Sequence, residues 1–164
     1  VFWLVVNALS GLLAASIISL FEPSIAQLTA LAVLMPIVAS MGGIAGVQTL
    51  TIMVRGIALG HVQAENTWHI VARQAAVGLV MGGLFALLGA ALAWAWFGKP
   101  LLGVAMGAAL VINLFASGLF GAVIPLLLRQ LRIDPALASG VLLNTLTDGI
   151  GFFSFLGIGT WILL

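Results

Sequence analysis

Cysteine and tyrosine are absent from this sequence, and charged residues are scarce. Only 5% of the 164 residues are charged, whereas 63% are hydrophobic. The absence of cysteine excludes disulfides and thiolate metal sites. Because a soluble domain carries about 25% charged residues, the composition indicates an integral membrane protein. The net charge of +1 gives no support for a nucleic-acid partner.

The motifs of several common enzyme classes are also missing. The sequence contains no nucleotide-binding glycine loop, no zincin helix and no hydrolase elbow. We therefore predict that the chain is not an enzyme.

Five apolar runs are long enough to cross a membrane. They cover residues 1–21, 24–53, 68–97, 101–128 and 135–164. Each exceeds the ~20 residues that a span requires, and each must be helical because backbone polar groups cannot stay unpaired in lipid. The sequence predicts an all-α membrane protein with five transmembrane helices in one domain, residues 1–164. Since Val1 stands inside an apolar run, we expect an upstream part to precede it.

The basic residues predict the orientation of these spans. Arg55 and Arg73 flank the loop between the second and third spans, and Arg129 and Arg132 lie between the fourth and fifth. The other two loops hold only Lys99. Because loops rich in Lys and Arg stay in the cytoplasm, we predict a cytoplasmic N-terminus and a C-terminus outside.

A single acidic residue, Asp148, lies deep in the last span. It follows Asp134 by 14 residues, or about 21 Å of helix. A carboxylate at that depth costs on the order of 3 kcal/mol, so it is rarely kept without a partner or a function. The polar and small residues predicted to share its helical face are Asn144, Thr145, Gly151 and Gly140.

A second polar stretch, residues 40–51, lies in the second span and holds Gly42, Gly43 and Gly46. Each glycine weakens a helix by roughly 1 kcal/mol relative to alanine. Two interpretations are open: a broken helix whose carbonyls line a pore, or close helix packing through the GxxxG pair Gly42 and Gly46. Close packing is also predicted for Gly78 with Gly82 and for Gly103 with Gly107, and an interhelical hydrogen bond for Asn113.

The two polar stretches resemble each other. Residues 48–51 read Gln-Thr-Leu-Thr and residues 144–147 read Asn-Thr-Leu-Thr. Because polar faces in lipid tend to seek each other, we hypothesise that the second and fifth spans face one cavity.

The side chains around Asp148 are oxygen donors, which suit Mg²⁺, Ca²⁺, Mn²⁺ or Na⁺. One negative charge does not balance a divalent ion, but a two-fold dimer with both copies of Asp148 on its axis would supply two. Mg²⁺ keeps several of its waters, so a wide ring that binds its hydration shell would suit it. A carboxylate that takes up a proton instead is the other physical option.

Three segments resemble the membrane domain of the MgtE family of bacterial magnesium channels. They are MGGIAGVQTLTIMVRGIAL at 41–59, LLLRQLRIDPALASG at 126–140 and NTLTDGIGFF at 144–153. The resemblance implies a homodimer in the inner membrane, with an Mg²⁺ pore at the subunit interface formed mainly by the second and fifth spans. It also implies an upstream cytosolic regulatory domain.

The predicted metal ligands are Asp148, Asn144, Gly43, Thr51 and Thr147, and the predicted pore-lining residues are Gly140, Ile44, Val47, Gln48, Thr145 and Gly151. Family members often carry asparagine where this chain has Ile44, Val47 and Gly140, so its pore mouth is less polar.

The leading hypothesis is therefore a dimeric Mg²⁺ conduit, with Mn²⁺, Ca²⁺ and Co²⁺ as further candidate ions. The alternatives are a carrier of divalent cations driven by H⁺ or Na⁺, and a membrane anchor that transports nothing.

Overall fold

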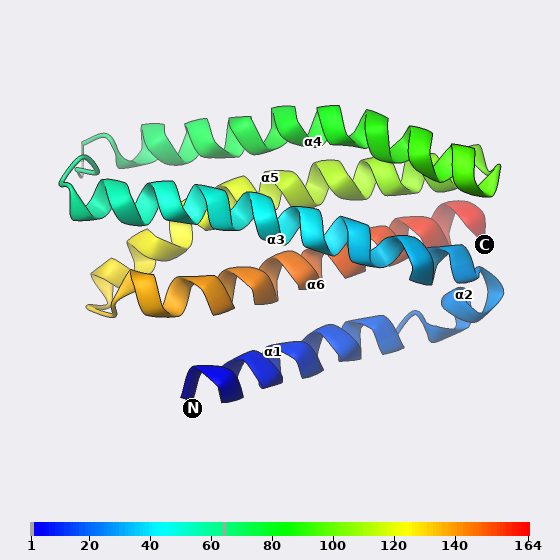
Figure 1. Ribbon diagram of the computed structural model, residues 1–164, viewed down its shortest axis with the longest axis horizontal. Coiled ribbons are helices and arrows are strands. Elements are labelled where there is room, and N and C mark those ends of the chain that lie inside the picture. The colour runs from blue at the N-terminus through cyan, green and yellow to red at the C-terminus, as the bar shows by residue number, and fades with distance from the viewer. Residues whose placement is uncertain (1, 64) are drawn as a thin grey trace.

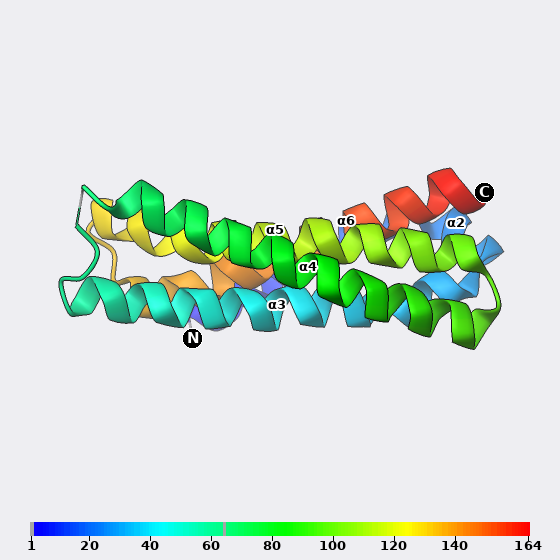
Figure 2. The same cartoon turned by 90° about the horizontal axis from the view of Figure 1, so that it is seen from above.

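The computed structural model describes residues 2–63 and 65–164, which form six helices joined by short connections (Figure 1). They are α1 (Phe2–Ser19), α2 (Glu22–Gln27), α3 (Thr29–Ala58), α4 (Thr67–Phe97), α5 (Pro100–Gln130) and α6 (Pro135–Leu163). The long helices run side by side along one axis (Figures 1 and 2). The start of α1 and the end of α6 lie toward opposite ends of the bundle. The all-α prediction is confirmed for these residues.

Four of the six helices, α3 to α6, are long and apolar enough to span a membrane. Helix α1 is apolar but has 18 residues, which gives about 27 Å of helix. This confirms four of the five predicted spans. The crossing by α1 stays a prediction, and Val1 lies outside the described residues.

The predicted second span, residues 24–53, is wrong at both ends. Residues 22–27 form the separate helix α2, with Pro23 in its first turn. Leu28, at φ −136° and ψ 87°, leaves the helical conformation and separates α2 from α3. Helix α3 then continues to Ala58, because residues 54–58 hold a single charged residue, Arg55, and no proline that would end the helix.

The glycine run does not break α3, so the broken-helix interpretation is wrong. The helix passes through Pro36 and all three glycines as one 30-residue element. Gly42 and Gly46 are buried against neighbouring helices, and this packing offsets the low helix propensity of glycine. The GxxxG pair therefore packs, as the second interpretation predicted.

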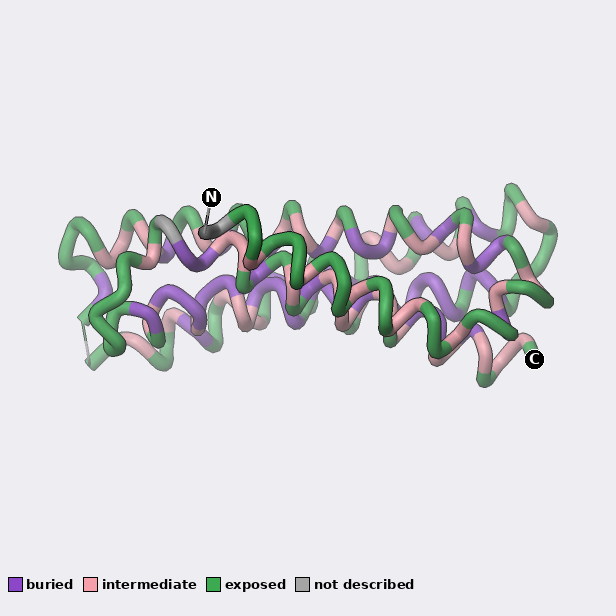
Figure 3. Tube along the Cα trace, turned by 90° about the horizontal axis from the view of Figure 1, so that it is seen from below, coloured by how far each residue is buried: buried purple, intermediate pink, exposed green. Residues whose placement is uncertain are grey.

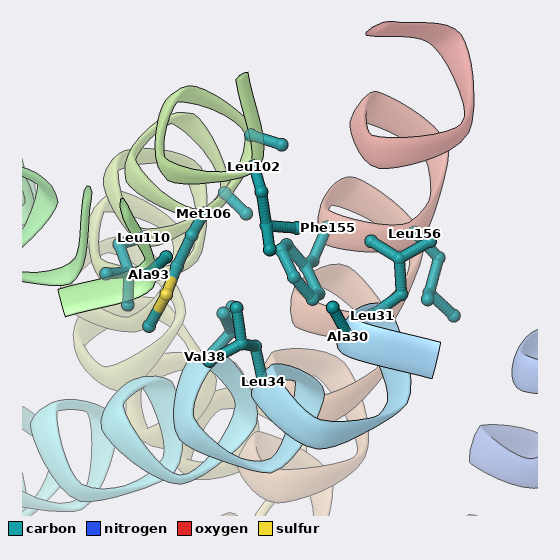
Figure 4. Packing of buried hydrophobic residues seen from close by; sticks show 12 residues of the cluster. Ala30, Leu31, Leu34, Val38, Ala93, Leu102, Met106, Leu110, Phe155 and Leu156 are labelled. Atoms are coloured by element: carbon teal, nitrogen blue, oxygen red, sulfur yellow. The ribbon is translucent and has the colours of Figure 1, made fainter. Parts of the chain in front are cut away.

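Helix α5 is the centre of the bundle, because it packs against α3, α4 and α6. Helix α1 lies at the edge and contacts mainly α6. The burial pattern follows this arrangement: buried segments run along the inside of the bundle and exposed ones along its outside (Figure 3). A core of side chains from α3, α5 and α6, with Ala93 of α4, fills one half of the bundle (Figure 4).

Glycines bring α4 and α5 into backbone contact. A Cβ placed on Gly82 would lie 2.9 Å from Cα of Val111, and one on Gly103 would lie 2.6 Å from the carbonyl oxygen of Ala90. Gly78 and Gly107 likewise face backbone atoms of the partner helix. The predicted packing role of these four glycines is confirmed.

Candidate functional site

A groove runs between α3 and α6, which lie side by side along much of their length. It has a volume of about 450 Å³. Its lining residues are Ala39, Ser40, Gly43, Ile44, Val47 and Gln48 from α3, and Asn144 and Asp148 from α6. Residues of the predicted second and fifth spans thus line one groove, and its role as an ion cavity stays a prediction.

Asp148 is the one ionisable residue among those that line the groove. It lies midway along the 29-residue helix α6 and is partly buried. Asn144 precedes it by one turn on the same side of the helix and is exposed. A carboxylate and an amide oxygen donor therefore project from α6 into one hollow at the middle of the bundle's length.

The residue of α3 that lies opposite Asn144 is Gly43. A Cβ placed on Gly43 would lie 3.7 Å from Oδ1 of Asn144, so no side chain separates the α3 backbone from the amide. Gln48 lines the same wall and is exposed. The arrangement offers a carboxylate, two amides and an accessible backbone, which are the oxygen ligands of hard cations.

Two exposed aliphatic side chains complete the α3 wall. Ile44 is 62% exposed and Val47 is 42% exposed. The same groove is therefore lined by exposed apolar side chains and by the carboxylate of Asp148.

The three predicted threonines do not line this groove. The hydroxyl of Thr51 donates to the carbonyl of Val47 at 2.8 Å and lies one turn further along α3. Thr147 is fully buried, and its hydroxyl lies 3.0 Å from the carbonyl of Leu143 on its own helix. Ligand roles for Thr51 and Thr147 stay predictions.

Thr145 instead faces α1. Its hydroxyl lies 2.6 Å from Oγ of Ser10 and 2.8 Å from the carbonyl of Val141. Residues three positions either side of Asp148 point about 120° apart around the helix, so Thr145 turns toward one neighbour and Gly151 toward another.

The two glycines of α6 that were predicted to line the pore have different surroundings. Gly151 is buried, and a Cβ there would lie 2.7 Å from Nδ2 of Asn113 on α5. Gly140 has open space where a Cβ would stand. The pore-lining role of Gly140, like that of Gly151 and Thr145, stays a prediction.

The predicted pore-lining set did not include Ser40 or Ala39, which line the groove on α3. Helical spacing was the available signal, because Ser40 lies three and four residues before Gly43 and Ile44. The interhelical hydrogen bond predicted for Asn113 is confirmed, since its Nδ2 donates to the carbonyl of Val38 at 2.8 Å.

Comparison with known proteins gives a consistent match. Residues 35–158 match the model of the MgtE family, described as a divalent cation transporter. The chain is 34% identical over 158 residues to the magnesium transporter MgtE of Bacillus subtilis, covering 96% of this chain and 35% of that protein.

Two further relatives have the same name. The magnesium transporter MgtE of Thermus thermophilus is 34% identical over 161 residues, 98% of this chain and 36% of its own length. That of Enterococcus faecalis is 31% identical over 146 residues, 89% of this chain and 32% of its own length. The chain thus spans about a third of the length of the curated relatives it matches.

Proposed function

Because this chain belongs to the MgtE family of divalent cation transporters, we propose that it conducts Mg²⁺ across the bacterial inner membrane. The observation that carries the proposal is the groove in which Asp148 of α6 faces the backbone and amide of α3. A carboxylate at membrane depth carries a free-energy cost. In a cation transporter, the passing cation offsets that cost.

The proposed pore needs two copies of the chain. One Asp148 supplies a single negative charge, and the open side of its groove carries the exposed Ile44 and Val47. A two-fold dimer that places the grooves face to face would bury these aliphatic side chains and bring two carboxylates to one axis. Two negative charges balance one Mg²⁺.

The ion would be bound through its water. Mg²⁺ dehydrates reluctantly and usually keeps several waters, and permeation requires binding weak enough for release. In the proposal, Asp148 and Asn144 accept hydrogen bonds from the hydrated ion on one wall, and the carbonyl of Gly43 accepts on the other. Gln48 and Thr51 extend this polar path along α3.

We also propose that the chain begins on the cytoplasmic side. Arg55 and Arg129 lie in the last turns of α3 and α5, at the end of the bundle where α4 and α6 begin. The opposite end carries Lys99. The greater number of basic residues at the first end supports a cytoplasmic location for it, where a regulatory domain preceding α1 would lie.

The central test is Asp148→Asn in the full-length protein. This change keeps the size and shape of the side chain but removes its charge and replaces one acceptor oxygen with an NH₂ donor. We expect Mg²⁺ uptake into proteoliposomes to fall by at least about tenfold, equivalent to roughly 1.4 kcal/mol in the barrier, while the protein still purifies as a dimer. Uptake that stays at the wild-type rate would refute the proposal.

Asp134→Asn is the matched control. Asp134 caps α6 by accepting a hydrogen bond from the backbone N–H of Ala136 at 2.9 Å, and asparagine is an equally good cap. The control therefore removes one carboxylate charge from the same helix without touching the groove. Its uptake should stay within about twofold of wild type.

A carrier driven by H⁺ or Na⁺ is the alternative function. The partial burial of Asp148 favours it, because a carboxylate shielded from water can bind a proton or Na⁺ alternately with the substrate. The two functions differ in one measurement. Carrier flux depends on a counter-ion gradient, whereas channel flux follows the Mg²⁺ gradient and the membrane potential after H⁺ and Na⁺ gradients are collapsed.

A further inference from the structure

Two buried polar residues of α5 lie directly behind the groove. Asn113 and Ser117 occupy successive turns, and both are 0% exposed. Asn113 donates from Nδ2 to the carbonyl of Val38 at 2.8 Å. The hydroxyl of Ser117 lies 2.7 Å from the carbonyl of Gly42 and 2.7 Å from that of Asn113 on its own helix. Two carbonyls one turn apart on α3 are thus tied to α5.

Glycines on both walls of the groove make room for the Asn113 amide. A Cβ on Gly42 of α3 would lie 2.6 Å from Cγ of Asn113, and a Cβ on Gly151 of α6 would lie 2.7 Å from its Nδ2. Real Cβ atoms essentially never come within 3.0 Å of a non-bonded neighbour, so neither position tolerates a side chain without a shift of Asn113. The amide of Asn113 therefore lies between α3 and α6, on their side that faces α5.

The same two contacts are adjacent to the proposed ion ligands. Gly42 directly precedes Gly43, and Gly151 follows Asp148 by one helical turn. A side chain that contacts both glycines contacts the backbone of both walls of the groove. It can therefore fix how far the Gly43 backbone stands from the Asp148 carboxylate.

The amide is kept although part of it is unsatisfied. Oδ1 of Asn113 is buried and has no hydrogen-bond partner, a condition that costs free energy in any folded protein. An aliphatic side chain of similar size would fill the space without that cost. Unlike an aliphatic side chain, Asn113 donates a hydrogen bond to Val38 and so can fix the register of α3 against α5. A fixed register between helices is the best-attested use of a buried polar group.

We propose that Asn113 and Ser117 form a clamp that sets the position of α3 against α6 and thereby the ion preference of the groove. The clamp residues touch no ion; they are positioning residues. Mg²⁺ and Ca²⁺ differ by about 0.3–0.5 Å in their distances to oxygen, so a small drift of one wall changes which ion fits. This inference rests on the proposed function of the groove.

The test compares ion preference in full-length variants reconstituted into proteoliposomes. Asn113→Leu removes the hydrogen bond at nearly constant volume, and Ser117→Ala removes the second one with almost no change in shape. We expect the ratio of Mg²⁺ to Ca²⁺ flux to fall about fivefold in each, with a larger change in the half-saturating Mg²⁺ concentration than in the maximal rate. Gly151→Ala, which pushes on the clamp from α6, should lower the ratio as well.

Gly103→Ala is the matched control. It places a methyl group 2.6 Å from the carbonyl of Ala90 at the α4–α5 contact, a packing fault of the same kind on the far side of α5. It should lower thermal stability without changing the ion ratio. If Asn113→Leu does not fold, Ser117→Ala carries the test.

A ratio in Ser117→Ala and Gly151→Ala that moves no more than in Gly103→Ala would overturn the clamp. Asp148→Asn separates this failure from that of the proposed function. If Asp148→Asn is inactive and the ratios are unchanged, only the clamp is wrong; if Asp148→Asn transports normally, the groove is not the ion path.

Discussion

At the scale of single residues, the groove combines a carboxylate with aliphatic side chains. Ile44 and Val47 stand on the α3 wall beside Gly43, opposite Asn144 and Asp148. Apolar linings raise the barrier to a hydrated ion because they offer its waters no hydrogen bonds, and narrow apolar constrictions can gate by dewetting. In the proposed dimer, these side chains would therefore limit the rate of Mg²⁺ passage.

This leads to a prediction for Val47→Asn. The amide should interact with the hydration shell of the ion, so Mg²⁺ uptake should rise on the order of threefold. Initial rates in proteoliposomes at a fixed Mg²⁺ gradient measure it. Val33→Asn is the control, because Val33 is 50% exposed on the same helix but does not line the groove. An equal rise in both variants would contradict a specific effect of position 47.

At the scale of helices, contacts decide what each glycine does. Gly82 and Gly83 are neighbours on α4 with opposite surroundings: Gly82 is buried against α5, whereas Gly83 is exposed and has nothing within 4 Å of an added Cβ. Their sequence context is nearly identical. Only the helix partner distinguishes a packing glycine from one that merely weakens the helix.

We therefore predict opposite effects of two adjacent substitutions. Gly82→Ala should destabilise the protein by about 1–3 kcal/mol, because its methyl group would stand 2.9 Å from Cα of Val111 and overpacking carries such a cost. Gly83→Ala should stabilise it by up to about 1 kcal/mol through helix propensity. Thermal unfolding in detergent, followed by circular dichroism, measures both. The same sign for the two variants would mean that α4 and α5 do not meet at Gly82.

At the scale of the whole molecule, the bundle is closed on the α5 side and open along α3 and α6. Helix α5 packs against three neighbours, while the groove between α3 and α6 faces outward with exposed Ile44 and Val47. A second copy of the chain facing this groove would complete both the packing and the charge balance.

Cysteine crosslinking can test that arrangement, and the 164 residues hold no cysteine that would compete with an introduced one. Ile44→Cys in full-length protein should form a crosslinked dimer in membranes with a short bifunctional reagent, since position 44 would lie close to the two-fold axis. Leu88→Cys, on the outer face of α4 and 64% exposed, should stay monomeric on a denaturing gel. Crosslinking through Leu88 but not Ile44 would place the dimer contact on α4.

Much of this protein follows directly from its sequence. A composition that is 63% hydrophobic and 5% charged requires a membrane environment. The lengths of the apolar runs determine α3 to α6, because a helix is the structure that pairs the backbone groups of a span of about 20 residues within one segment. Asp148 and the polar stretch at 144–147 stand out because a charge at membrane depth is costly.

Only the tertiary structure decided which polar residues meet. Asn144, Thr145, Thr147 and Gly151 all lie within one turn of Asp148, yet Asn144 lines the groove, Thr145 faces α1, Thr147 is buried and Gly151 holds Asn113. At positions i−4, i−3, i−1 and i+3 relative to Asp148, they point in directions that span roughly 160° of the helix surface. Neighbouring helices contact different parts of that arc. The sequence therefore determined that α6 is a helix, whereas the helices packed against α6 determined which of its polar residues line the groove.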